Sequence, residues 1–289
     1  MLNGDPVGAI TRTIERLVYK NRKILGFSDR DANSNLVNIE WWSMRRSDCL
    51  ENVGDLLSTV IVNYMLSIRT KTMRPSGNDR FFASIGSVLG MGINDTVVWG
   101  SGFLNDSPAQ IIRPRIKRLD IRAVRGPCTR EVLLNRGYDC PEIYGDPAIL
   151  TPWAYPRKSE CGNGVGLVCH YAADKSAFDC CAGVQPISPL VSNFRSFIDE
   201  IISKELIVSS SLHGIILAEA YGVPAVLLAD NRKNFDLFKY RDWYESTGRK
   251  CPNPAESIDE AIHQAHQRVP DLSDLQQGLL ESFPYEIFA

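Results

Sequence analysis

Several features that mark metal, disulfide-rich and nucleic-acid-binding proteins are missing from this sequence. Its 289 residues contain eight cysteines but no Cys-x-x-Cys pair, and only four histidines. This spacing fits neither a zinc site nor a disulfide framework, so we expect no metal. We expect the neighbours Cys180 and Cys181 to be reduced thiols. The formal net charge is −2, which disfavours a predominantly basic nucleic-acid binder.

Long apolar runs are absent as well. None reaches the roughly 20 residues that a helix needs to cross a bilayer. Residues 1–22 carry charges and lack the apolar core of a signal peptide. The composition, 44% hydrophobic and 23% charged, is that of an ordinary globular protein. We therefore expect a cytoplasmic protein with no nucleic-acid partner.

Short apolar segments and amphipathic segments alternate along the chain. Strands are predicted at residues 36–42, 81–88, 96–99, 120–124, 165–169, 205–209 and 223–228. Helices are predicted after Asn52, within the last 20 residues, and at residues 8–22, 129–135, 194–204, 214–221 and 257–268. Alternation of this kind is typical of parallel sheets covered by helices.

Proline and glycine gather between two such series of strands and helices. Residues 151–162 hold Pro152, Pro156 and Gly162, and this segment is the best linker in the sequence. We therefore predict an α/β fold with two Rossmann-like domains, residues 1–150 and residues 163–289, facing a cleft. Ligands of parallel sheets bind at the carboxyl ends of strands, and the cleft between two halves is the natural site.

The most informative segment holds three serines, a histidine and a glycine between a predicted strand and a predicted helix. These residues are Ser209, Ser210, Ser211, His213 and Gly214. A helix N-terminus attracts anions, above all phosphate. An imidazole beside that anion can donate or accept a proton, so we predict that His213 is catalytic. The alternative is that these side chains only cap the helix and satisfy backbone groups.

Small residues and an arginine follow two predicted strands of the first half. Gly100, Ser101 and Gly102 let a ligand or a second backbone approach closely, or they form an ordinary tight turn. Arg125 offers a guanidinium fork that suits a carboxylate or a phosphate. The alternative for Arg125 is a surface ion pair.

Six short motifs stand in an order that is typical of one family. They are Asn52-Val-Gly-Asp55, Val98-Trp-Gly-Ser-Gly102, Arg122-Ala-Val-Arg-Gly-Pro-Cys-Thr129, Tyr144-Gly-Asp-Pro147, Ser209-Ser-Ser-Leu-His-Gly214 and Lys239-Tyr-Arg-Asp-Trp-Tyr-Glu-Ser-Thr-Gly-Arg249. In this combination the chain resembles the polysaccharide pyruvyl transferase family, in particular its bacterial exopolysaccharide ketal-pyruvate transferases. The resemblance covers roughly residues 45–250.

The resemblance implies a fold like that of the two-domain GT-B glycosyltransferases. It also implies transfer of pyruvate from phosphoenolpyruvate to two sugar hydroxyls, which gives a cyclic ketal and releases phosphate. By the family pattern His213 matches the general acid, and Arg125 matches an arginine that holds the donor. No cofactor is implied, because phosphoenolpyruvate is itself the donor substrate.

The chain departs from some family members at Ser211, where they carry an arginine that is thought to grip the donor. The candidates to replace that charge are Lys239, Arg241, Arg249 and Lys250. The predicted donor-binding residues are Ser209, Ser210, Ser211, Gly214, Gly100, Ser101, Gly102 and Lys239.

Asn52 and Asp55 flank Gly54 before a predicted helix, and helix capping accounts for them without any function. We nevertheless predict that they bind the acceptor, with the first half as the acceptor side and the second half as the donor side. The expected acceptor is a sugar of a lipid-linked oligosaccharide. Such an acceptor would bring the protein to the inner face of the membrane without insertion.

Two other functions fit the same residues. A GT-B glycosyltransferase with a nucleotide-sugar donor would use the same serine-rich loop for a diphosphate, and Glu219 on the following helix would contact a ribose. A non-catalytic glycan-binding subunit is the other alternative, because a decayed donor site would lack the arginine that Ser211 replaces. Binding of uridine diphosphate, of phosphoenolpyruvate or of glycan alone discriminates the three functions.

Overall fold

Two parallel sheets organise the chain. In a computed structural model, the first sheet has the order β1-β3-β4-β5, and the second has the order β10-β9-β6-β7. The first contains β1 (Ile39–Glu40), β3 (Phe81–Ala83), β4 (Thr96–Trp99) and β5 (Leu119–Ala123). The second contains β6 (Val165–Val168), β7 (Val184–Pro186), β9 (Leu206–Ser209) and β10 (Ala225–Leu227). The prediction of an α/β fold with parallel sheets is thus confirmed.

The structure describes residues 39–40, 50–69, 81–89, 96–106, 118–157, 162–173, 183–230, 236–264 and 268–288. The predicted helix at 8–22 and the pair Cys180 and Cys181 lie outside these residues. The described cysteines, Cys128, Cys140, Cys169 and Cys251, are all free thiols. Burial raises the pKa of Cys140 and of Cys251 to about 11, so both thiols stay protonated at neutral pH.

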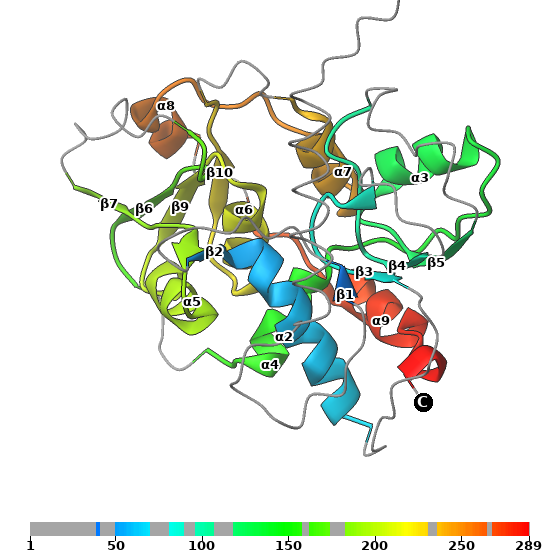
Figure 1. Ribbon diagram of the computed structural model, residues 1–289. Helices are drawn as coiled ribbons and strands as arrows, with labels where there is room; N and C mark the ends of the chain where they lie inside the picture. Colours follow the sequence, from blue (N-terminus) through cyan, green and yellow to red (C-terminus); the bar gives the residue numbers. More distant parts are fainter. Residues whose placement is uncertain are drawn as a thin grey trace, which may run out of the picture.

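Helices follow most strands. They are α2 (Val53–Ser67), α3 (Pro127–Leu134), η2 (Pro147–Leu150), α4 (Thr151–Ala154), α5 (Phe194–Ile202), α6 (Leu212–Ala220), α7 (Phe238–Ser246), α8 (Ile258–His263), α9 (Ser273–Ser282) and η4 (Tyr285–Phe288), of which η2 and η4 are 3₁₀-helices. In Figure 1 the second sheet, α5 and α8 lie on the left, while the first sheet, α3 and α9 lie on the right. The predicted stops are confirmed at Gly137 and Gly222, whose positive φ angles of 79° and 77° suit glycine.

One predicted strand is shorter in the structure. The strand predicted at 81–88 ends at Ala83, and the next carbonyls accept hydrogen bonds from serine hydroxyls and, at Gly86, also from the Gly102 N–H. Ser58 Oγ donates to Ile85 O over 3.3 Å, and Ser101 Oγ donates to Gly86 O over 2.8 Å. The segment predicted as a linker starts with helix α4, because a proline is tolerated in the first turn of a helix.

Helix α2 connects the first half of the chain to the second. The strand before it, β2 (Glu51–Asn52), pairs antiparallel with β8 (Leu190–Val191), and Val53 N–H donates to Pro189 O over 2.8 Å. Along its length α2 packs against α5, α4 and η2. One cluster of buried apolar side chains accordingly runs through both sheets. The division into two domains facing a cleft stays a prediction.

The last helix returns to the first sheet. Helix α9 packs against β5 and η2, and Trp99 Nε1–H on β4 donates to Leu279 O over 2.9 Å. The aromatic rings beyond α9 complete this contact: Phe283 lies 4.8 Å from Trp99 and Phe288 lies 5.2 Å from Phe82, between ring centroids. The described part of the C-terminal segment thereby covers a face of the first half's core.

Candidate active site

Serines before α6 hold the start of this helix against the second sheet. Ser209 Oγ lies 3.0 Å from Val168 O and 2.8 Å from Ser211 O, and it accepts a hydrogen bond of 3.0 Å from the Ser211 N–H. A Cβ atom at Gly214 would lie only 2.3 Å from Ser209 Oγ, so the close approach of helix and strand requires glycine there. The predicted turn from strand into helix is confirmed.

The serine hydroxyls of this turn face the protein rather than open space. Ser210 Oγ accepts a hydrogen bond of 3.0 Å from the His170 N–H, and Ser210 O accepts one of 2.7 Å from the Tyr240 hydroxyl. The first N–H groups of α6 have no partner within the helix, so any attraction for an anion comes from the backbone. Donor binding by the three serines and Gly214 stays a prediction.

His213, in the first turn of α6, lies among residues of the first half. Its ring packs on Gly54 of α2, and its side chain is 12% exposed. Nε2 of the ring is 3.4 Å from Oδ2 of Asp146, whose side chain is completely buried. Both atoms are buried and make no hydrogen bond within the part of the chain that the structure describes. Three elements distant in sequence, namely α2, η2 and α6, therefore meet at one imidazole.

Replacing Gly54 by alanine is expected to lower turnover. A Cβ atom there would lie 1.9 Å from Nδ1 of His213, so the ring must leave its place. A displacement of about 1 Å at a reacting group costs on the order of 10²-fold in rate. Steady-state kinetics with Gly54→Ala measures the effect, and circular dichroism checks the fold. Gly278→Ala is the matched control, because the nearest atom to its Cβ would be 3.3 Å away on Ile143. Equal kinetics of both variants and wild type would contradict the assignment of His213.

Two titratable groups, Asp55 and Lys239, influence one another near this histidine contact. Asp55 follows Gly54 on α2 and is half-buried, and Lys239 on α7 is 8% exposed. Burial raises the pKa of the Asp55 carboxyl, the charge of Glu51 raises it further, and the charge of Lys239 opposes the shift. Asn52 caps α2, because its Oδ1 accepts a hydrogen bond of 3.0 Å from the Gly54 N–H. Acceptor binding by Asn52 and Asp55 stays a prediction.

The raised pKa of Asp55 predicts that stability falls with increasing pH. The folded protein holds the proton more tightly than the unfolded chain, so the free energy of unfolding decreases as the pH rises from the ordinary value of 3.8 through the folded pKa. Asp55→Asn is expected to remove this dependence, as measured by urea unfolding across pH 3–8. Asp271→Asn is the control of opposite sign, because hydrogen bonds from Ser273 lower the pKa of Asp271. A steeper loss of stability in Asp55→Asn would overturn the prediction.

Arg125 lies in the interior. Its side chain is fully buried, and Nε donates to Oδ2 of Asp242 on α7 over 3.0 Å. Nη1 donates to Ser87 Oγ over 2.8 Å, and Nη2 donates to Phe103 O over 2.6 Å. Asp242 also accepts hydrogen bonds from the backbone and the hydroxyl of Thr129. The alternative of a surface ion pair is wrong, since the pair is buried, and contact between Arg125 and a donor stays a prediction.

The small residues after β4 pack against Arg125 and the start of η2. A Cβ atom at Gly102 would lie 2.6 Å from Cζ of Arg125, and one at Gly100, whose φ is +85°, would lie 2.3 Å from Cδ of Pro147. Close approach of protein groups thus accounts for both glycines. Because Pro147 follows Asp146, the contact between Gly100 and Pro147 also places the turn after β4 next to Asp146. Donor binding by Gly100, Ser101 and Gly102 stays a prediction.

The candidate cations of the last motif differ in their surroundings. Arg249 makes a two-pronged ion pair with Glu219, with distances of 2.7 Å and 2.9 Å, and Trp243 Nε1–H donates to the same carboxylate over 2.9 Å. Arg241 lies 3.2 Å from the sulfur of Cys128. Lys250 is exposed, and Lys239 is the candidate whose charge acts on Asp55, the residue after the Gly54 that contacts His213. The pair with Arg249 occupies the Glu219 carboxylate, which the nucleotide-sugar alternative assigns to a ribose.

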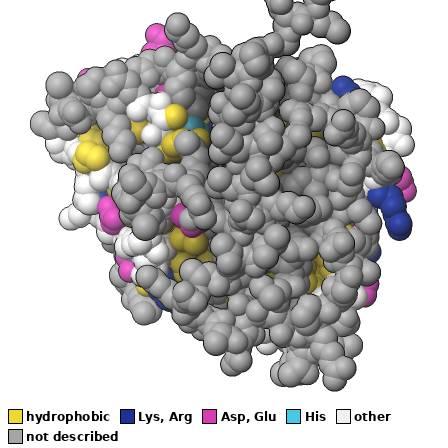
Figure 2. Space-filling model, in the orientation of Figure 1, with side chains coloured by type: hydrophobic (Ala, Val, Ile, Leu, Met, Phe, Trp, Pro, Cys, Tyr) yellow, Lys and Arg dark blue, Asp and Glu magenta, His cyan; other side chains and the backbone are white. Residues whose placement is uncertain are grey.

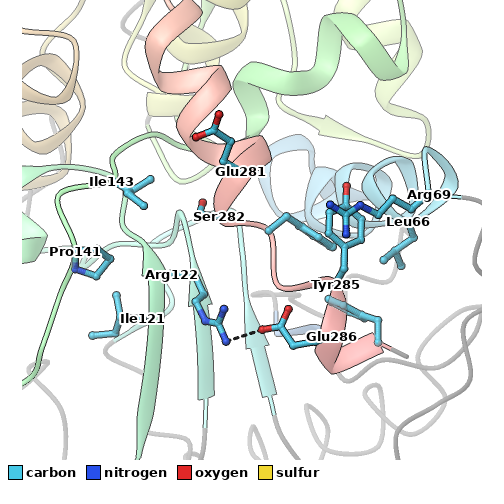
Figure 3. A pocket seen from close by; sticks show the side chains of 12 residues that line it. Leu66, Arg69, Ile121, Arg122, Pro141, Ile143, Glu281, Ser282, Tyr285 and Glu286 are labelled. Atoms are coloured by element: carbon cyan, nitrogen blue, oxygen red, sulfur yellow. Dashed lines mark ion pairs between the residues drawn. The ribbon is translucent and has the colours of Figure 1, made fainter.

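A cavity of about 650 Å³ lies elsewhere, between β5, α9 and η4. Figure 3 shows Arg122 reaching toward Glu286, with which it forms an ion pair of 2.7 Å, and Arg69 lying over the ring of Tyr285. None of the predicted donor, acceptor or catalytic residues lines this cavity. We therefore place the candidate active site at His213 and not in this cavity.

The described residues contain no group of three or more His, Cys, Asp and Glu side chains placed to hold a metal ion. Within the same described ranges, every helix is too short or too polar to span a bilayer. On the face drawn in Figure 2, Asp and Glu side chains of described residues show at several separate points, and the visible Lys and Arg side chains lie mostly along the right edge.

Fold and site together define a class: an α/β protein whose parallel strands bring a histidine, a buried aspartate and a helix N-terminus to one place. The model of the family described as polysaccharide pyruvyl transferase matches residues 83–232, which is 150 of the 289 residues. The chain belongs to this family. It is also similar to the succinoglycan biosynthesis protein ExoV of Rhizobium meliloti (strain 1021), with 27% identity over 213 residues. That alignment covers 68% of this chain and 62% of the relative, so the chain spans about three fifths of the relative's length.

Proposed function

We propose that the protein transfers pyruvate from phosphoenolpyruvate to two hydroxyls of one sugar in a bacterial surface-polysaccharide precursor, forming a ketal and releasing phosphate. Membership of the polysaccharide pyruvyl transferase family supports the class of reaction. The name of the relative, a succinoglycan biosynthesis protein, supports an exopolysaccharide as the product. The observation that carries the proposal is the position of His213, in the first turn of α6 and beside the buried carboxylate of Asp146.

The proposed reaction begins with the transfer of a proton to phosphoenolpyruvate. Phosphoenolpyruvate is an enol ester of low reactivity until its methylene carbon is protonated, and the His213 imidazolium supplies that proton. Protonation turns the methylene into a methyl group and leaves an oxocarbenium-like centre at C2. The first sugar hydroxyl adds to C2 and loses its proton, which neutral His213 can accept. The second hydroxyl then bonds to C2 as the bond to the phosphate oxygen breaks, and the proton of this hydroxyl passes to the departing phosphate.

Charges near the site suit the donor. Phosphoenolpyruvate carries a phosphate and a carboxylate, and the backbone N–H groups at the start of α6 favour an anion. Lys239 supplies a positive charge close enough to Asp55 to oppose the rise in its pKa. We propose that Lys239 takes over the role of the arginine that other members carry at the position of Ser211. The role of Arg125 in this scheme is to hold the donor, directly or by fixing the adjacent turn.

The proposed acceptor is a lipid-linked oligosaccharide at the inner face of the membrane, which the protein would approach as a peripheral enzyme in the cytoplasm. The test is to incubate the purified protein with phosphoenolpyruvate and a panel of lipid-linked and synthetic glycans. Released phosphate and a glycan that gains the mass of one pyruvyl ketal are the expected results. A thermal shift with uridine diphosphate, and none with phosphoenolpyruvate, would favour the nucleotide-sugar alternative.

A further inference from the structure

We propose that Asp146 is a positioning residue that fixes the tautomer of His213, so that Nδ1 is the nitrogen that exchanges protons with the substrate. The proposal concerns the site of the proposed function and rests on it. Asp146 belongs to the Tyr144–Pro147 motif, which lies in none of the predicted strands or helices. Its carboxylate joins η2 of the first half to α6 of the second.

The two carboxylate oxygens of Asp146 have different neighbours. Oδ1 accepts a hydrogen bond of 3.0 Å from the Ala148 N–H and thereby caps η2, which fixes the direction of the carboxylate. Oδ2 is buried, makes no hydrogen bond within the described residues, and lies 3.4 Å from Nε2 of His213. A buried carboxylate oxygen without a hydrogen-bond partner is unfavourable, so we expect the group 3.4 Å from Oδ2 to be a hydrogen-bond donor.

Nε2 of His213 is the matching donor. It is also buried and also lacks a hydrogen bond within the described residues, and Oδ2 of Asp146 lies 3.4 Å away, so the two atoms can satisfy one another. The separation of 3.4 Å exceeds the roughly 2.9 Å of a normal N–H···O bond. Hydrogen bonds of active sites are often long without substrate and tighten when it binds. A hydrogen on Nε2 is the arrangement that pairs both atoms.

The other ring nitrogen has a different environment. Nε2, but not Nδ1, is among the buried ring atoms without a partner in the described part of the chain, and the side chain keeps 12% of its surface exposed. The ring packs against Gly54 close to Nδ1, and this contact is possible because Gly54 has no side chain. With Nε2–H directed at Asp146, neutral His213 carries its lone pair on Nδ1, and the imidazolium carries its transferable proton there.

Asp146→Asn tests the proposal with little change of shape. The amide oxygen can still accept the hydrogen bond from Ala148, which directs the amide NH₂ group toward Nε2. The NH₂ group donates, so neutral His213 must then place its hydrogen on Nδ1. The wrong tautomer is expected to lower kcat by about 10²-fold or more, with little change in the KM for phosphoenolpyruvate.

Nitrogen-15 NMR of the histidine ring is the deciding measurement, because it reports the tautomer without any substrate. The spectra are recorded at about pH 8.5, well above the ordinary histidine pKa of about 6.5, and the His213 signals are assigned from their loss in His213→Gln. We expect hydrogen on Nε2 in the wild type and on Nδ1 in Asp146→Asn. Asp271→Asn is the matched control, since Oδ1 of Asp271 likewise accepts from the N–H two residues on, at Ser273, but at an exposed site.

Hydrogen on Nδ1 in the wild type would overturn the proposal, whatever the variants do. An unchanged tautomer and an unchanged kcat in a folded Asp146→Asn would overturn it as well. Absence of pyruvyl transfer by the wild type would count against the proposed function alone, because the NMR result on the Asp146–His213 pair stands without a substrate.

Discussion

Replacing His213 by glutamine is expected to reduce kcat for pyruvyl transfer by about 10²–10⁴-fold, the range that a positioned general acid contributes. Glutamine roughly preserves the size of the side chain, so the contact with Gly54 is kept while the proton donor is lost. Binding of phosphoenolpyruvate should persist, because the anion-attracting groups at the start of α6 are backbone N–H groups. Phosphate release in the presence of acceptor, together with a thermal shift by phosphoenolpyruvate, measures both effects.

His263→Gln is the matched control for this experiment. His263 is exposed on α8, and its Nδ1 contacts only the Asp259 carbonyl of its own helix among the described residues. We expect wild-type kinetics from this control. A folded His213→Gln protein with undiminished turnover would remove His213 from the reaction, and with it the mechanism proposed here.

Replacing Arg125 by methionine is expected to lower the free energy of unfolding by about 3–5 kcal/mol, the usual cost of removing one partner of a buried ion pair. Both side chains of the Arg125–Asp242 pair are completely buried. Methionine fills part of the volume but leaves the Asp242 carboxylate without its cation. Urea unfolding of the variant and the wild type measures the difference.

Arg122→Gln is the control for the Arg125 variant. The Arg122–Asp120 pair has a similar distance of 2.6 Å, but its side chains are 34% and 27% exposed, so the expected loss is at most about 1 kcal/mol. The experiment also separates the two roles considered for Arg125. A variant that unfolds like the wild type but binds phosphoenolpyruvate more weakly would show a donor-binding guanidinium rather than a structural one.

Much of the fold follows from local patterns in the sequence. The strands at 96–99 and 206–209 and the helix stops at Gly137 and Gly222 depend on apolar runs and on glycine conformations, which are properties of short segments. The boundary that was missed lies where distant partners bind the chain. The strand that starts at Phe81 ends at Ala83, and Ser58 and Ser101, neither of them near in sequence, bind carbonyls that follow.

The site was predictable only in part, for the same reason. His213 stands out because a strand, hydroxyl residues and a helix start follow one another within a few positions. Asp146 does not stand out, since an aspartate before a proline is an ordinary start of a short helix. Its distance to His213 results from the packing of α2 and η2 against α6, which residue spacing does not encode.

The hydrogen bond from Trp99 to Leu279 spans 180 residues of sequence. During synthesis the strands of the first sheet leave the ribosome long before the aromatic residues that cover them. Phe82 and Trp99 must therefore stay exposed to water, or to a chaperone, while all of the second sheet is made. Contacts of such long sequence separation slow folding, because a large loop has to close before the contact stabilises anything. The core of the first half is consequently completed late, although its strands are made first, and apolar surface left uncovered in this way favours aggregation.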